Sequence, residues 1–189
     1  MSNAKTSRLE GKACLLFINI LPQQDCITQK IAPIDLTFLH KTATSLDSLG
    51  LLQPSLIKSR NIKGLIPTQQ VTREDYGWFD TLTKADKDVY VASGWARLPY
   101  RSEPADAIIL TYDDPNGSQN IFALVADNLK LNRDDVAKSL NNNAYIKTGW
   151  QKSFSINELP TVSTNINAWA FDAKSGFAYK LNGTHNITK

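Results

Sequence analysis

The sequence predicts a mainly β fold, an antiparallel β-sandwich of the immunoglobulin-like or jelly-roll-like kind with an N-terminal segment that contains a helix. Short strand-like segments separated by turn residues follow one another through the C-terminal part of the chain. Most of the connections between them are too short to hold the helices that a parallel sheet requires. The length of 189 residues is enough for one domain with a substantial core.

The strongest strand signal lies at residues 89–97, where β-branched and aromatic residues lead into Gly94-Trp95-Ala96. Because side chains alternate along a strand, one face carries only small residues: Ala92, Gly94 and Ala96. The other face carries Trp95, whose indole can bury about 200 Å². We therefore expect Trp95 to anchor the core.

The other tryptophans also have small residues as neighbours in the sequence. Three of the four tryptophans follow a glycine, and Trp169 stands between two alanines. Small neighbours and strand placement assign Trp150 and Trp169 to the core together with Trp95. Their spacing is unequal, so the pattern indicates recurrent packing chemistry, not an array of repeats.

The first part of the chain divides into short elements. Residues 1–4 look like an expression scar, and residues 5–74 should form a strand, a helix and a connector packed on a sandwich module at residues 75–189. The apolar residues 14–20 read as the strand. A helix is expected over residues 33–51, with Asp35 at its N-terminus and Gly50 as C-cap.

The sandwich module has clearer signals. Residues 106–112 and 119–125 flank Asp-Asp-Pro-Asn-Gly-Ser, so they should form a hairpin. Next comes a short helix over residues 132–140, for which Asn132 or Asp134 can supply the cap. Three further strands are expected at residues 146–156, 164–172 and 177–181.

Composition excludes several classes of protein. The net charge is +3, with basic and acidic residues interspersed, which argues against a nucleic-acid partner. The longest apolar run, residues 13–21, is shorter than the roughly 20 residues of a membrane-spanning helix, and no signal peptide is evident. Cys14 and Cys26 lack neighbours at zinc-site spacing, so they are two buried thiols or one disulfide, and neither metal nor cofactor is expected.

Several short motifs, read in order, carry a resemblance: Gly94-Trp95-Ala96, Arg133-x-Asp135-Val136-Ala137, Gly149-Trp150, Ala168-Trp169-Ala170-x-Asp172 and Tyr179-x-Leu181-x-Gly183. Residues 75–185 thereby resemble a β-sandwich module at the C-terminal, extracytoplasmic end of multi-pass bacterial membrane proteins, an uncharacterised family. Some of those proteins resemble membrane-embedded glycosyltransferases that use lipid-linked sugars. The resemblance implies a periplasmic or extracellular location, a membrane tether upstream and no catalytic residue at the matching positions. One departure is Asp134, where similar modules carry proline.

Catalytic patterns are missing. The chain has no Gly-x-Ser-x-Gly elbow, and its two histidines, His40 and His185, stand outside any motif. Glycoside hydrolysis by a carboxylate pair is an alternative, and five acids are candidates: Asp113, Asp114, Asp134, Asp135 and Asp172. Turn and cap positions account for most of them. Residues 113–120 have calcium-ligand types without the EF-hand spacing.

The sequence therefore favours a non-catalytic accessory or ligand-binding domain that contacts a glycan or a lipid-linked sugar, in contact with an upstream membrane region of the same chain. Indole and phenol faces stack on the apolar faces of sugar rings, and polar neighbours fix hydroxyl groups. The candidate platform, placed in predicted connections, consists of Tyr76, Trp78, Tyr100 and Arg101. The alternatives are a carbohydrate-active enzyme and a sandwich used only for structure or protein contact.

Overall fold

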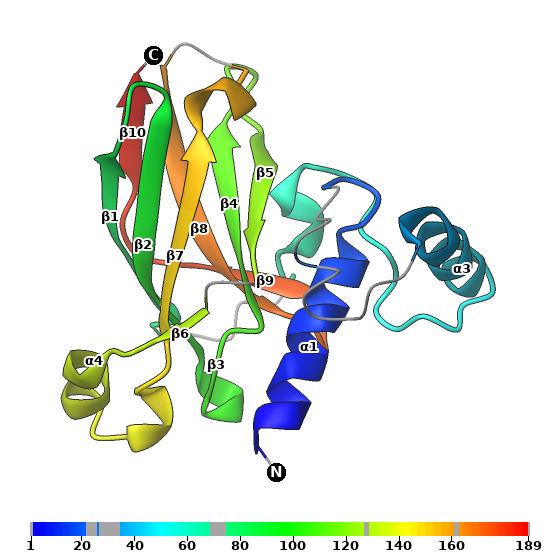
Figure 1. Ribbon diagram of the computed structural model, residues 1–189, viewed down its shortest axis with the longest axis horizontal. Helices are drawn as coiled ribbons and strands as arrows, with labels where there is room; N and C mark the ends of the chain where they lie inside the picture. The colour runs from blue at the N-terminus through cyan, green and yellow to red at the C-terminus, as the bar shows by residue number, and fades with distance from the viewer. Residues whose placement is uncertain are drawn as a thin grey trace.

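The computed structural model describes residues 2–21, 26, 35–68, 75–126, 129–160 and 163–188. Ten strands form two antiparallel sheets that face each other (Figure 1), which confirms the predicted mainly β sandwich. The front sheet has the order β1 (Gly77–Lys84), β2 (Val89–Leu98), β7 (Gly149–Ser155) and β6 (Leu129–Leu131), with β3 (Glu103–Pro104) paired to β2. The back sheet has the order β10 (His185–Thr188), β8 (Ser163–Asp172), β4 (Ala107–Asp113) and β5 (Gln119–Val125), with β9 (Phe177–Lys180) paired to β8.

Helices lie outside the two sheets. They are α1 (Ser2–Leu16), α3 (Leu36–Ser48) and α4 (Asp134–Ser139), and four short 3₁₀ turns accompany them: η1 (Ile62–Leu65), η2 (Pro99–Arg101), η3 (Asn143–Tyr145) and η4 (Ile156–Glu158). Within the described ranges, no helix is both long enough and apolar enough to cross a membrane.

Strand β4 at the centre of the back sheet is buried on both faces over its first five residues. Ile108 and Leu110 of β4 belong to the core between the sheets, whereas Ile109 packs with α1 in a second core on the outer side. Both sets are fully buried, which explains the unbroken apolar run of β4, since a strand covered on both faces needs no polar alternation. Helix α1 lies on the back sheet and does not cover the outer face of the front sheet (Figure 1).

The expected strand at residues 14–20 is wrong: α1 runs to Leu16 and a turn follows. The buried residues Glu10, Ala13, Cys14 and Phe17 are spaced by three and four, which is the pattern of a helix lying on a sheet. Phe17 meets Phe171 of β8 edge-on, with 5.1 Å between ring centroids. The apolar run from residue 13 hides this periodicity because most of the turn after the helix is apolar too.

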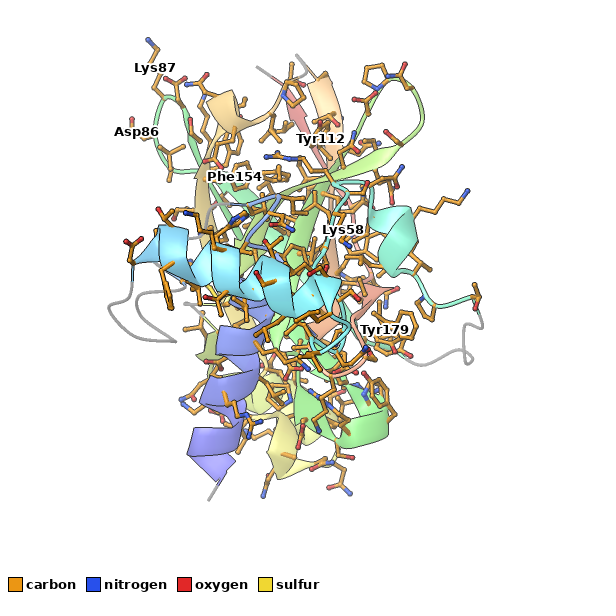
Figure 2. All side chains as sticks on the ribbon, turned by 90° about the vertical axis from the view of Figure 1, so that its right-hand side faces the viewer. Lys58, Asp86, Lys87, Tyr112, Phe154 and Tyr179 are labelled. Carbon is orange, nitrogen blue, oxygen red and sulfur yellow. A yellow bond between two sulfur atoms is a disulfide. The ribbon has the colours of Figure 1, made fainter. Side chains whose placement is uncertain are left out.

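Helix α3 begins and ends close to where the sequence predicts. Asp35 accepts hydrogen bonds from the backbone of Thr37 and Phe38, and Gly50 follows the helix with a φ of +69°. The expectation that its apolar face docks on the sheet is only partly met. Ala43 is the one residue of the helix that is fully buried, and α3 crosses the face turned toward the viewer in Figure 2.

The sandwich module follows the sequence more closely. Strands β4 and β5 form the predicted hairpin, and β7, β8 and β9 fall within or next to the three expected segments. Helix α4 differs at its start: the N-cap position belongs to Arg133, and no side chain caps it. Neither Asn132 nor Asp134 therefore occupies the cap.

The tryptophans divide between layers. Trp150 is fully buried between the sheets, and Trp169 is buried on the α1 side of the back sheet, where its indole N–H donates to Thr111 Oγ1 (3.0 Å). Trp95 departs from the expectation, because it is only half-buried and belongs to neither core. The small residues of β2 face inward instead, since Trp150 of the neighbouring strand fills the space over Gly94.

Cys14 and Cys26 form a disulfide, with 6.1 Å between their Cα atoms. Both residues are buried in the core beneath the back sheet. The disulfide joins the end of α1 to the chain that leads toward α3.

Candidate functional site

A row of large side chains crosses the outer face of the front sheet. Trp78 of β1 pairs with Trp95 of β2, Trp95 pairs with Gly149 of β7, and Gly149 pairs with Leu131 of β6. Cross-strand partners have side chains on the same face of a sheet. Trp78 is 47% exposed and Leu131 is 39% exposed. We name these four residues the Trp row.

Two glycines allow close packing in this sheet, Gly149 on the outer face and Gly94 on the inner face. A Cβ atom on Gly149 would lie 2.8 Å from the carbonyl oxygen of Leu131 and 3.1 Å from Cγ of Arg133, so glycine lets both residues approach the sheet. A Cβ atom on Gly94 would lie 2.1 Å from the carbonyl oxygen of Trp78. The Gly-Trp pairs of the sequence therefore reflect close packing between neighbouring strands.

Uncharged polar side chains form the next row on the same face. Thr81, Ser93 and Gln151 are partners across β1, β2 and β7. The hydroxyl groups of Thr81 and Ser93 are hydrogen-bonded at 2.7 Å. Hydroxyl and amide groups both donate and accept, so this row can bond to hydroxyl groups of a ligand.

Arg133 connects the Trp row to two carboxylates. Its guanidinium donates to both oxygens of Asp135, from Nε at 2.9 Å and from Nη2 at 2.7 Å, and Nη1 donates to Asp80 at 2.5 Å. The hydrogen bonds from Arg133 lower the pKa of Asp135 to about 2. Asp80 occupies a bulge in β1 next to Thr81, so the three residues hold charge beside both rows. We name them the Arg133 clasp.

Further polar groups lie beside Trp78. Asn182 forms a bridge with Trp78, donates its backbone N–H to Gly77 and accepts from the N–H of Phe79. The side-chain amide of Asn182 donates to the carboxylate of Asp75. Trp78 is thus an exposed indole on β1, an edge strand whose backbone is hydrogen-bonded to Asn182.

The structure brings together three of the four residues that the sequence grouped as a platform, Tyr76, Tyr100 and Arg101, around Tyr179 and Asp172. Tyr76 stacks on Tyr179, with 4.3 Å between ring centroids, and Tyr100 contacts the same ring at 5.8 Å. Trp78 lies apart from them in the Trp row. Arg101 is not available as a surface group, because its side chain is only 10% exposed.

Arg101 instead compensates two buried aspartates. It donates to Asp106 at 2.8 Å and to Asp172 at 2.9 Å. Burial would raise the pKa of Asp172, but hydrogen bonds from Tyr100 and Ser175 outweigh it and the pKa is lowered. For Asp106 burial prevails, and its pKa is raised. Burial, followed by the bond to Asp172, raises the pKa of Tyr100.

The carboxylate pair required for glycoside hydrolysis gains no support from the positions of the candidate acids. Asp172 is held by Arg101 and Tyr100, and Asp135 by Arg133. Asp114 accepts from the backbone of its own turn, at Asn116. Asp134 lies in the first turn of α4.

Asp113, which begins the proposed calcium loop, also has a structural role. Its carboxylate accepts from three amides: Gln119, Asn165 and Asn167. No three His, Cys, Asp or Glu side chains among the described residues are placed to hold a metal ion. His40 bonds to Asn19 and His185 to the carbonyl oxygen of Phe79.

A separate hollow of about 390 Å³ lies where residues 54–65 meet the turn between β8 and β9. Its lining includes Lys58, which lies beside α3 in Figure 2, and Phe177. Lys58 Nζ pairs with Asp47 at 3.0 Å. The positive charge of Lys58 at the hollow is therefore already paired with a carboxylate of α3.

Sequence reasoning assigned Trp95 to the wrong face and missed Leu131, Gln151 and the Arg133 clasp. The alternation of side chains along β2 puts the small residues on one face and Trp95 on the other, and this pattern is the sequence signal for which face is buried. If the face with the small residues Ala92, Gly94 and Ala96 is assigned to pack against a bulky neighbour, Trp95 is assigned to the outer face. The cross-strand pairing that aligns Trp95 with Trp78 and Gly149 has no local signature.

No protein-family model matches the chain, and no curated protein matches its sequence.

Proposed function

We propose that this chain is a non-catalytic glycan-binding domain whose site is the Trp row on the front sheet. The observation that carries the proposal is the cross-strand pairing of Trp78 with Trp95 on the solvent-facing side of a rigid sheet. A ligand that stacks on these indoles meets Thr81, Ser93 and Gln151 in the adjacent row.

The chemistry of these rows matches that of a sugar. A pyranose ring has apolar C–H faces, which stack on indole, and an equatorial rim of hydroxyl groups, which need donors and acceptors. Strands hold the side chains at fixed spacing, so little conformational entropy is lost when the ligand binds.

We also propose that the domain is extracytoplasmic and belongs to a larger membrane-anchored protein, as its motifs suggest. The disulfide between Cys14 and Cys26 supports this placement, because disulfides persist mainly in oxidising compartments. A lipid-linked sugar remains within the proposed ligand class, since its sugar part offers the same stacking faces.

The test is binding to a panel of glycans and lipid-linked sugars, followed by titration of each hit with wild type and Trp78→Ala. We expect Trp78→Ala to lower affinity by about tenfold or more, because exposed aromatic anchors dominate binding energy. Phe177→Ala is the matched control: Phe177 is 39% exposed on β9, at the hollow, and its loss should leave affinity unchanged.

Equal affinity of Trp78→Ala and wild type would refute the Trp row as the site. Loss of binding in Phe177→Ala but not in Trp78→Ala would move the site to the hollow. Acrylamide quenching gives a second readout, because a bound sugar should shield Trp78 and Trp95, whereas Trp150 is already buried.

A different observation favours a second candidate, a domain for protein contact. Four exposed apolar residues gather on α3 and the turn after it: Phe38, Leu46, Leu49 and Leu51. Phe38, Leu46 and Leu49 recur at helical spacing along α3 and its C-cap, so this apolar side can pack against a second copy of this chain. This candidate predicts concentration-dependent dimers in sedimentation experiments, and Leu49→Asp should abolish them.

A further inference from the structure

We infer that the site takes a neutral polysaccharide chain lying across the strands of the front sheet, not a single sugar and not an acidic glycan. This inference rests on the proposed function and names the ligand class of that same site. The length of the Trp row, the charge around it and the acceptors beside it point to this class.

The Trp row is longer than one sugar ring. It crosses β1, β2, β7 and β6, which are three successive hydrogen-bonded pairs. At a strand spacing of about 4.8 Å the row spans about 14 Å. Exposed apolar side chains mark both ends, Trp78 at 47% and Leu131 at 39%, and the half-buried Trp95 lies between them.

Gly149 lets the side chains of Leu131 and Arg133 pack over the middle of the row. It is the partner of both Trp95 and Leu131, and it carries no side chain. A chain of sugar rings that contacts the indoles of β1 and β2 therefore continues over the side chains of Arg133 and Leu131, which pack above β7. A monosaccharide would use only one end of this surface.

The charges next to the row do not favour an anion. Arg133 is compensated by Asp80 and Asp135 through three hydrogen bonds. Arg97, two residues after Trp95 on β2, donates Nε to the carbonyl oxygen of Asp75 and stacks on Tyr145 at 5.1 Å. Arg133 faces the two carboxylates of Asp80 and Asp135, and Asp75, whose carbonyl oxygen binds Arg97, adds a third carboxylate nearby. A uronic acid or sulfated sugar would meet no net positive charge here.

The same carboxylates suit hydroxyl groups. Ionised carboxylates act only as acceptors and can accept several hydrogen bonds, so a sugar hydroxyl can donate to an oxygen that also accepts from arginine. Asp80 lies one residue before Thr81, and its carboxylate is 32% exposed. Arg133 holds it in place, which fixes the acceptor beside the polar row.

The test compares neutral and uronic-acid oligosaccharides of equal length, each as a series from one sugar to six. We expect affinity to rise at least tenfold between one sugar and the length that spans the row, and neutral chains to bind at least tenfold more tightly than acidic ones. In Asp80→Asn/Asp135→Asn the ratio of neutral to acidic affinity should fall toward one, because two negative charges are removed.

The outcomes separate this inference from the proposed function. If acidic chains bind as tightly as neutral ones, or single sugars as tightly as chains, while Trp78→Ala still removes binding, the ligand class is wrong and the glycan site stands. If no oligosaccharide binds, or if Trp78→Ala leaves binding intact, both proposals fail. An unchanged ratio in the double variant also overturns the assignment of Asp80 and Asp135.

Discussion

Trp95 and Trp150 each follow a glycine, yet they lie on opposite faces of the front sheet. Gly94 pairs with Trp150, and Gly149 pairs with Trp95, so each indole lies beside a residue without a side chain. A Cβ atom on Gly94 would lie 2.9 Å from Cζ2 of Trp150, which shows how closely the inward indole fits. The Gly-Trp motif therefore places one indole, Trp150, in the core and another, Trp95, on the outer face.

This difference predicts unequal costs of truncation. Trp150→Ala should lower the free energy of unfolding by about 3–5 kcal/mol, because a buried indole leaves a cavity. Trp95→Ala should cost about 1–2 kcal/mol, since a half-buried side chain loses less apolar area. Urea unfolding of the two variants measures both values. Similar losses in the two variants would place Trp95 in the core after all.

At the residue scale, sequence reasoning separates the two faces of a strand more easily than it chooses between them. Ala92, Gly94 and Ala96 are visible as one face of β2, but their inward orientation depends on Trp150, which lies more than 50 residues away in the chain. The Arg133 clasp has a partly local signal, because Arg133 and Asp135 are two residues apart. Its third member, Asp80, is again distant.

At the scale of elements, α1 shows why a short apolar run is ambiguous. Residues 13–17 suit a buried strand or one turn and a half of helix equally well, and length usually decides between them. The buried positions Glu10, Ala13 and Phe17 extend the helical pattern back into a polar region. The β4–β5 hairpin was predictable because its turn residues are local and specific.

The disulfide should stabilise the link between α1 and the chain after it. Closing the loop between Cys14 and Cys26, which are 12 positions apart, is expected to contribute about 3 kcal/mol through the entropy of the unfolded chain. Reduction of the wild type should therefore lower the midpoint of urea unfolding. The double variant Cys14→Ser/Cys26→Ser should show a similar loss and no response to reductant.

A wild type whose stability is unchanged by complete reduction, verified by thiol titration, would contradict this role. A single variant, Cys26→Ser, separates the loss of the bond from the loss of apolar packing, because Cys14 then keeps its place beside Phe17 in the core. Its stability should match that of the reduced wild type.

At the scale of the whole molecule, the layers decide where a ligand can bind. Helix α1 and residues 56–66 cover one side of the back sheet, and the front sheet covers the other. The outer face of the front sheet offers strands to solvent, and the Trp row lies there. The sequence predicted two sheets and a helix, but which sheet the helix covers depends on contacts between distant segments.

The Arg101 cluster joins the two sheets at one end of the sandwich. Arg101 lies in η2, directly after β2 of the front sheet, while Asp172 ends β8 of the back sheet and Asp106 precedes β4. Side chains of both aspartates are no more than 3% exposed. Because the charges are buried, removing one partner costs more than the pair contributes.

Arg101→Met should therefore lower the free energy of unfolding by about 3–5 kcal/mol at pH 7, since two buried carboxylates lose their cation. In the variant, burial raises the folded-state pKa of Asp106 further above the unfolded value, because Arg101 no longer opposes it, whereas Asp172 keeps its hydrogen bonds from Tyr100 and Ser175. A raised pKa means that stability is lost as pH rises, so the variant should be more stable at pH 5 than at pH 7. In the wild type the pKa shifts oppose each other, upward for Asp106 and downward for Asp172, and this gain in stability on acidification should be absent.

Urea unfolding at both pH values tests this prediction, with Glu103→Gln as control, because Glu103 is the more exposed partner of Arg101. A variant that weakens further at pH 5 would show that the aspartates stay ionised without Arg101.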